Sequence, residues 1–271
     1  MSRHPQDTAD FSGRDEEFRK QFSCELIPTS RRGVYVIPPA PPGFDPNTAS
    51  PRELLRHGLP WRRPTAGDPP ALRRAWERAF SRDWLTRDRI TPELEPGPGD
   101  PRPDGVPKFP PPISQTFSSS FIAGAGLRGG RWSGVIGSWT VPTAAPSGLI
   151  PPEVPLGFWA SSSAVALDGF EFGENATNDR LLAGVRYAIL DAFKNPTPVY
   201  RAFVWWMGPG PNPYADWYPI AAVQPGDQVL VSVSYFAGGA IIHFVNETSG
   251  QYFPIALNPT TNPSAAGSSV S

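Results

Sequence analysis

Cysteine and histidine are scarce in this chain of 271 residues, which contains one cysteine and three histidines. The single cysteine, Cys24, excludes an internal disulfide bond and any metal site built from cysteines. His4, His57 and His243 are far apart in the sequence, which argues against a metal site built from histidines. We therefore expect a protein without a bound metal and without a cofactor.

Long apolar runs and an excess of charge are absent as well. No apolar stretch approaches the roughly 20 residues that a membrane-spanning helix needs, so we expect no membrane association. The first twenty residues are rich in charge and lack the apolar segment of a secretory signal, which leaves the cytoplasm as the default location. A formal net charge of −1 gives no electrostatic reason to expect a nucleic-acid partner. None of these features indicates an oligomeric state.

Proline and glycine are abundant, with 36 and 26 residues, which favours strands, turns and linkers over a helical protein. Charge divides the chain: residues 1–110 hold 18 of the 24 Lys and Arg residues and 16 of the 25 Asp and Glu residues. We therefore predict a polar leader over residues 1–115 and a separate β domain over residues 116–271. The Pro-rich composition of residues 95–112 is typical of an extended linker. Limited proteolysis is expected to cut there and to separate the two parts.

The leader is predicted to hold two short helices. Ser50 is a suitable N-cap, Pro51 favours the first helical position, and Gly58 ends the helix. A second helix over residues 69–85 has an apolar stripe and an arginine-rich face, which can contact phosphate or simply face solvent. Residues 1–33 have mixed charge and few apolar residues, so we expect little structure there.

The second part of the chain consists of short apolar and alternating runs separated by Gly, Pro and polar turns. The last run contains a hairpin whose turn lies at residues 246–250. Many short strands with almost no helix predict a mainly β fold, an antiparallel β-sandwich. The predicted strand segments are residues 133–142, 161–169, 179–190, 199–207, 225–236 and 240–257.

Several short motifs between Trp132 and Gln251 resemble, in order and spacing, those of the eqolisins, the glutamic peptidases. The motifs are WSGVIGSWTVP, SSSAVALDG, LLAGV, YRAFVWW with the later DWYP, PGDQVLVSV and FVNETSGQ. This resemblance implies an antiparallel β-sandwich of concanavalin A-like architecture. The segments GFDPNTASPRELLRHGLP and ALRRAWERAF also resemble a leader that precedes eqolisin-like domains.

The catalytic pair of that family does not carry over to this sequence. In eqolisins a Glu, assisted by a Gln, activates water, and the Gln amide can stabilise the oxyanion. The Gln lies in a Leu-Gln-Ala-Gly-like motif, which here reads Leu-Leu-Ala-Gly and places Leu182 at the Gln position. Leucine has neither donor nor acceptor. The family's Glu lies in a late Ala-Glu-Trp-Ile-Val-Glu-like motif that this sequence does not reach before Ser271, so we expect either a truncated sequence or a lost strand.

Four aromatic residues near the expected cleft are the candidate binding residues: Trp205, Tyr214, Trp217 and Tyr218. The best match to the family's strand Ala-Trp-Tyr-Glu-Trp-Tyr-Pro begins at Ala202, which puts Trp205 where the family has a cleft glutamate. Exposed aromatic rings stack on sugar rings or on peptide side chains. The same residues can instead form part of a packed aromatic core.

Four further positions in or near these motifs bear on the chemistry. Ala164 and Ala166 replace the Trp and the first Gly of the family's Ser-Ser-Ser-Trp-Val-Gly-Ile-Asp-Gly motif. Asp168 can be an acid, but Asp-Gly at a strand end more often forms a turn. His243, on an apolar hairpin without an evident Ser or Cys partner, is interpreted as structural.

Two functional hypotheses follow. The first is a non-catalytic eqolisin-like β-sandwich that binds a peptide or an oligosaccharide in the former cleft, or serves in assembly. The second is a glutamic-type endopeptidase with an incomplete or rebuilt active site. Leu182 favours the first hypothesis.

Overall fold

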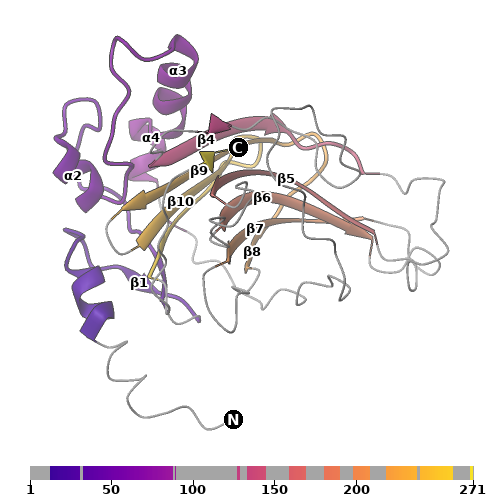
Figure 1. Cartoon of the computed structure of the whole chain (residues 1–271), viewed down its shortest axis with the longest axis horizontal. Helices are drawn as coiled ribbons and strands as arrows, with labels where there is room; N and C mark the ends of the chain where they lie inside the picture. Colours follow the sequence, from indigo (N-terminus) through magenta and orange to yellow (C-terminus); the bar gives the residue numbers. More distant parts are fainter. Residues whose placement is uncertain are drawn as a thin grey trace, which may run out of the picture.

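The protein is an antiparallel β-sandwich, as the sequence predicts, and its two sheets lie face to face (Figure 1). The structure is a computed structural model. It describes residues 13–30, 33–87, 89, 127–128, 133–144, 159–168, 180–189, 198–207, 218–236, 239–258 and 269–270.

Each sheet has six strands within the described part of the chain, and every recorded strand pair is antiparallel. Sheet A has the order β1 (Ile27–Pro28), β2 (Val34–Val36), β11 (Gln251–Leu257), β10 (Gly239–Asn246), β9 (Gln228–Phe236) and β4 (Gly134–Thr140). Sheet B has the order β3 (Leu127–Arg128), β12 (Ser269–Val270), β5 (Trp159–Asp168), β6 (Arg180–Ile189), β7 (Val199–Met207) and β8 (Tyr218–Ala222).

Alternate residues of both sheets form the central core. Val231 of β9 and Phe244 of β10 pack in one cluster with Leu181 and Ala183 of β6, and all four are 0% exposed. Successive side chains of a strand point to opposite faces. The intervening residues of each strand therefore lie on the two outer faces of the sandwich.

The outer face of sheet A is covered by the leader. In Figure 1 the violet helices of the leader lie beside β9, β10 and β4, on the side away from β5 to β8. One cluster joins Leu54, Trp76 and Phe80 of the leader to Val245 and Tyr252 of sheet A. All eight residues of β10 are buried because both faces of this strand are covered. This double burial explains why its sequence is a continuous apolar run rather than an alternating one.

The leader also contributes a strand to sheet A itself, while the division into two parts near residue 115 stays a prediction. Strand β2 pairs with β11, with Val36 opposite Ile255 and Val34 opposite Leu257. Val34 reaches the core between the sheets. The boundary near residue 115 and the linker 95–112 lie outside the described residues, so their position stays a prediction.

Helix α2 (Pro51–Arg56) begins as predicted. The Ser50 side chain accepts a hydrogen bond from the Glu53 backbone, and the Glu53 carboxylate accepts one from the Ser50 backbone. This reciprocal pair satisfies two N–H groups that the helix itself cannot. His57 is the C-cap, and Gly58 follows with a φ of 71°.

The second predicted helix is divided into two. Helix α3 (Pro70–Ala79) ends at Phe80, and α4 (Arg82–Thr86) begins after Ser81. The break lets Phe80 and Leu85 both enter the cluster on sheet A. Arg78 of α3 forms a bidentate ion pair with Glu247 in the β10–β11 turn.

The N-terminal residues from 13 onward are more ordered than their composition indicates. Residues 13–19 are helical. Phe18 and Phe22 pack with Ile241 and Ala256 on the outer face of sheet A. The Asp15 carboxylate accepts hydrogen bonds from the Tyr35 hydroxyl at 2.6 Å and from the Asn258 amide at 2.8 Å. Apolar packing and these hydrogen bonds together hold the segment on sheet A.

The hairpin of β10 and β11 turns where the sequence predicts. The Asn246 side-chain oxygen accepts hydrogen bonds from the backbone N–H groups of Thr248 and Ser249, each at 3.1 Å. Gly250 closes the turn with a φ of 72°.

Within the described residues, no helix combines the length and apolar character needed to cross a membrane.

Gly58 gives a stability test of how the leader packs. A Cβ atom at this position would lie 2.4 Å from Ile37 Cδ1, and the φ of 71° disfavours any L side chain. Gly58→Ala is expected to lower the free energy of unfolding by about 2–4 kcal/mol, of which ~1–2 kcal/mol reflects the left-handed backbone. Urea denaturation measures the change. Gly43→Ala is the control, because Gly43 has a φ of 91° but no atom within 4 Å of an added Cβ. Equal losses for the two variants would show that the contact with Ile37 is unimportant.

The strand pairing of the leader also predicts how the chain behaves after it is cut. A protease cut within residues 95–112 is expected to yield two fragments that elute together from a sizing column in native buffer. They should separate in denaturant, because the β2–β11 pairing and the two leader clusters hold them together. Separate elution in native buffer would contradict the packing described above.

Candidate functional site

The candidate site lies on the outer face of sheet B, opposite the core. Leu182 is central to it. The neighbours of Leu182 in β6, Leu181 and Ala183, are fully buried in the core, so the alternation of β6 places Leu182 on the outer face. It is half-buried there. The register sets Ala166 of β5 opposite Leu182 on one side and position 205 of β7 opposite it on the other.

The next row along the sheet contains small residues. Ala164 lies opposite Gly184, and Gly184 lies opposite Phe203. A Cβ atom on Gly184 would lie 2.1 Å from the Ser163 carbonyl oxygen and 2.6 Å from Ala164 Cα. Strands β5 and β6 therefore come so close here that only glycine fits. This steric need accounts for the glycine of the Leu-Leu-Ala-Gly motif without any catalytic role.

A polar row lies beyond the apolar one. Ser162 is opposite Arg186, and Arg186 is opposite Arg201. Arg201 is exposed, and Arg186 is partly buried. Sequence reasoning did not connect these two arginines, because only the register of β6 and β7 brings them together.

The described side chains of this face form a floor without acid–base groups. Ala164, Ala166, Leu182 and Phe203 are apolar, and Phe203 and Ala166 are each 2% exposed. Among the side chains that the structure describes on the outer faces of β5, β6 and β7, none carries a carboxyl or a carboxamide group. Ala164 and Leu182 are partly exposed and can provide apolar contact, but none of these side chains can activate a water molecule.

Only part of the predicted binding cluster is described. Position 205 lies in β7 opposite Leu182, and Tyr218 begins β8 with its backbone opposite Val204. The side chains of Trp205 and Tyr218 lie outside the described set, as do residues 214 and 217 entirely. The proposed stacking cluster therefore stays a prediction. Asp168 ends β5, and its backbone lies opposite Arg180.

His243 is structural, which confirms the interpretation from sequence. Its ring lies on the outer face of sheet A under the leader and is 1% exposed. Nε2 is 2.8 Å from the Gly58 carbonyl oxygen, and Nδ1 is 2.7 Å from the Tyr252 hydroxyl. Burial lowers the pKa of His243 to about 3, so the imidazole is neutral over the ordinary pH range. Its contacts are with the leader and with β11, at the sheet opposite the candidate site.

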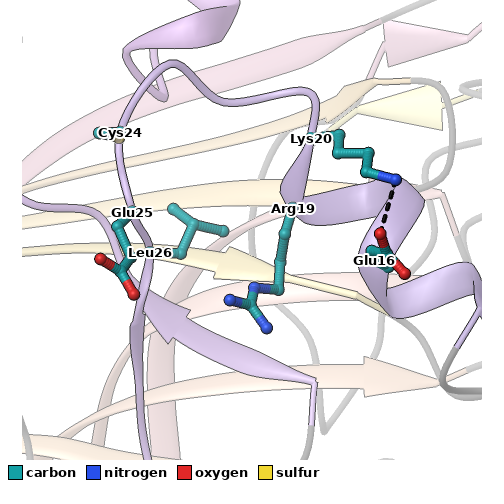
Figure 2. A pocket seen from close by; sticks show the side chains of 6 residues that line it. All are labelled: Glu16, Arg19, Lys20, Cys24, Glu25 and Leu26. Atoms are coloured by element: carbon teal, nitrogen blue, oxygen red, sulfur yellow. Dashed lines mark ion pairs between the residues drawn. The ribbon is translucent and has the colours of Figure 1, made fainter.

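A small pocket on the leader offers no alternative active site. The pocket holds about 240 Å³, and Figure 2 shows it between the first helical segment and the chain that follows. Glu16 and Lys20 form an ion pair across one helical turn at 2.6 Å, with both side chains 69% exposed. Burial raises the pKa of the Cys24 thiol, so the thiol stays protonated and is a poor nucleophile. The lining residues are Glu16, Arg19, Lys20, Cys24, Glu25 and Leu26.

No metal site is evident in the described ranges, where no group of three or more His, Cys, Asp or Glu residues is placed to hold an ion.

Comparison with solved structures finds glutamic peptidases. A scytalido-glutamic peptidase with a peptide-based transition state analog shares 17% identity with this chain at a TM-score of 0.38. The alignment covers 54% of this chain and 59% of that one. SCP-B, a member of the eqolisin family in complex with the tripeptide Ala-Ile-His, shares 16% identity at a TM-score of 0.37. The alignment covers 54% of this chain and 58% of SCP-B. The chain thus spans less than two thirds of the length of these structures.

No curated protein sequence matches the chain. The model of the peptidase A4 family matches residues 120–269, which is more than half of the chain and includes the strands from β3 to β11. Within that match lie the Leu-Leu-Ala-Gly motif of β6 and the outer face of sheet B described above. On the strength of the family match, this chain belongs to the peptidase A4 family, the eqolisins.

Proposed function

We propose that this protein is a non-catalytic member of the peptidase A4 family that binds an extended peptide or oligosaccharide on the outer face of sheet B. The observation that carries the proposal is Leu182, which takes the place of the family's glutamine. A leucine side chain cannot orient water or donate a hydrogen bond to an oxyanion. Its neighbours Ala166 and Phe203 are apolar and almost fully buried, so they supply no catalytic group, and the partly exposed Ala164 and Leu182 favour binding rather than catalysis.

The chemistry of this face sets a modest affinity. Aromatic stacking at Trp205, Tyr214, Trp217 and Tyr218 would contribute ~0.5–1.5 kcal/mol per contact beyond area burial. A few such contacts must also offset the loss of ligand freedom on binding. We therefore expect dissociation constants near the micromolar range.

A second function is favoured by the family assignment itself. Family members are glutamic peptidases, so this chain is alternatively a glutamic-type endopeptidase whose catalytic residues have been rebuilt. That alternative requires a carboxyl group near Leu182 to act as base. Asp168, at the end of β5 on the neighbouring strand, is the position at which to test it.

The two functions predict different outcomes in a proteolysis assay. We expect the purified chain to leave an unfolded protein substrate intact between pH 3 and pH 6, within the background of a mock preparation. Mass spectrometry of the substrate is the measurement, and inhibitors of other protease classes remove contaminants. Cleavage that persists with these inhibitors and disappears in Asp168→Asn would establish the endopeptidase instead.

Ligand binding is tested with a matched pair of substitutions on one face. Leu182→Gln places an amide in the apolar floor and is expected to weaken binding about fivefold, which corresponds to ~1 kcal/mol. Val199→Gln is the control, because residue 199 lies on the same strand as residue 205 but six positions away, or ~20 Å. Trp205→Ala should abolish the change in tryptophan fluorescence that a peptide or glycan panel produces.

Three results would count against binding at this face. The first is a panel in which no member perturbs the fluorescence or releases heat in calorimetry. The second is an equal loss of affinity in Leu182→Gln and Val199→Gln. The third is unfolding of the domain by Trp205→Ala, which would make Trp205 a core residue.

A further inference from the structure

The contact between His243 and Gly58 joins the leader to the outer face of sheet A. Gly58 lies just after α2, and its carbonyl oxygen is 2.8 Å from His243 Nε2. Phe80, which follows α3, packs edge-on against the imidazole with ring centroids 4.8 Å apart. The His243 ring therefore contacts the residues that follow both helices.

Hydrogen-bond chemistry assigns one tautomer to the neutral ring. A carbonyl oxygen can only accept, so Nε2 carries the proton that is donated to Gly58. Nδ1 is then the acceptor, and the Tyr252 hydroxyl donates to it at 2.7 Å. The neutral imidazole thus satisfies both partners. A protonated ring would keep both contacts, because the Tyr252 hydroxyl can also accept, so the cost of protonation is that of a buried positive charge.

The charged surroundings oppose protonation as well. Arg89 lies 4.4 Å from the centroid of the Tyr252 ring, and its positive charge acts against a charge on His243. Arg89 is held there by hydrogen bonds to the backbone carbonyls of Ile37, Trp84 and Leu85. The titratable group opposite Nδ1 is Tyr252, whose burial raises its pKa, so this hydroxyl supplies no negative charge.

The remaining neighbours bring no compensating charge. In the sheet, the register partners of His243 are Ser232 of β9 and Pro254 of β11. His57, next to Gly58, packs instead on Phe44 with ring centroids 4.2 Å apart. Ser23 Oγ lies 3.4 Å from His57 Nδ1. A proton on His243 would therefore be a buried charge. Among the described residues, the charged group that acts on this ring is Arg89, which also carries a positive charge.

We propose that His243 is an acid-operated latch, which holds residues 51–87 of the leader on sheet A while it is neutral and releases them when it is protonated. Release removes the leader helices from the outer faces of β9, β10 and β11. It leaves the pairing of β9, β10 and β11 within sheet A intact. The inference concerns the sheet opposite the candidate site, so it is independent of the proposed function.

The direction of the pH effect follows from proton linkage. The pKa of His243 is about 3 when the leader is packed, against 6.5 for an exposed histidine. Between these values the open state binds a proton that the packed state does not. Packing of the leader therefore weakens as pH falls below 6.5, and the opening equilibrium should rise roughly 30-fold between pH 7.5 and pH 5.

Hydrogen exchange followed by mass spectrometry on the full chain measures this opening. After correction for the intrinsic pH dependence of exchange, amides of residues 51–87 should lose protection between pH 7.5 and pH 5. Amides of β6 and β7 should keep theirs. In His243→Gln the leader should show no such loss, because the glutamine amide can bond both Gly58 and Tyr252 but does not ionise.

His57→Gln is the matched control, because His57 adjoins Gly58 without contacting His243, and it should retain most of the pH response. Three outcomes would overturn the latch. They are a pH-independent leader in the unmodified chain, an equal response in His243→Gln, and simultaneous loss of protection in β6 and β7. If His243→Gln does not fold, the unmodified chain still decides, because the latch requires leader amides to open before those of sheet B.

Discussion

The structure depends on one constraint, which is that β10 and its neighbours in sheet A present apolar residues on both faces. One face packs against sheet B, through residues such as Ile242 and Phe244. The other face, with Ile241 and Val245, would be exposed to water without a further layer. Burial of apolar area contributes about 25 cal/mol per Å². The packing of the leader on this outer face of sheet A therefore stabilises both the leader and the sheet. The leader is a third layer of the fold rather than an appendage.

The contacts between that third layer and the sheet differ in their polarity and in their sensitivity to pH. Most are apolar and insensitive to pH. His243 is a buried polar member of this interface, and protonation would place a positive charge inside it without a carboxylate in contact with the ring. A buried polar group is stable when all of its partners are satisfied and becomes costly when one protonation event changes that balance. In the proposed latch, this residue makes the packing of the third layer sensitive to pH.

The family assignment and the proposed function rest on different residues of this chain. The sandwich and the order of its motifs are those of the peptidase A4 family. Gly184 is retained because the close approach of β5 and β6 leaves no space for a Cβ. Leu182, two residues earlier, stands where the resemblance to the eqolisins implies a glutamine, and the proposed lack of catalysis rests on it. A fold supplies positions, and the side chains at those positions decide the function.

The sequence by itself determined the elements and their local signals. Strand alternation, the capping residues Ser50 and Glu53, and the turn at Asn246 depend on neighbours within a few residues, so they are visible in the chain. The identity of Leu182 at the expected glutamine was visible for the same reason. The tertiary structure alone decided that the leader covers sheet A, that residues 13–19 form a helix, and that Arg186 lies opposite Arg201. These features depend on contacts between residues far apart in the chain, whose energies no local pattern encodes.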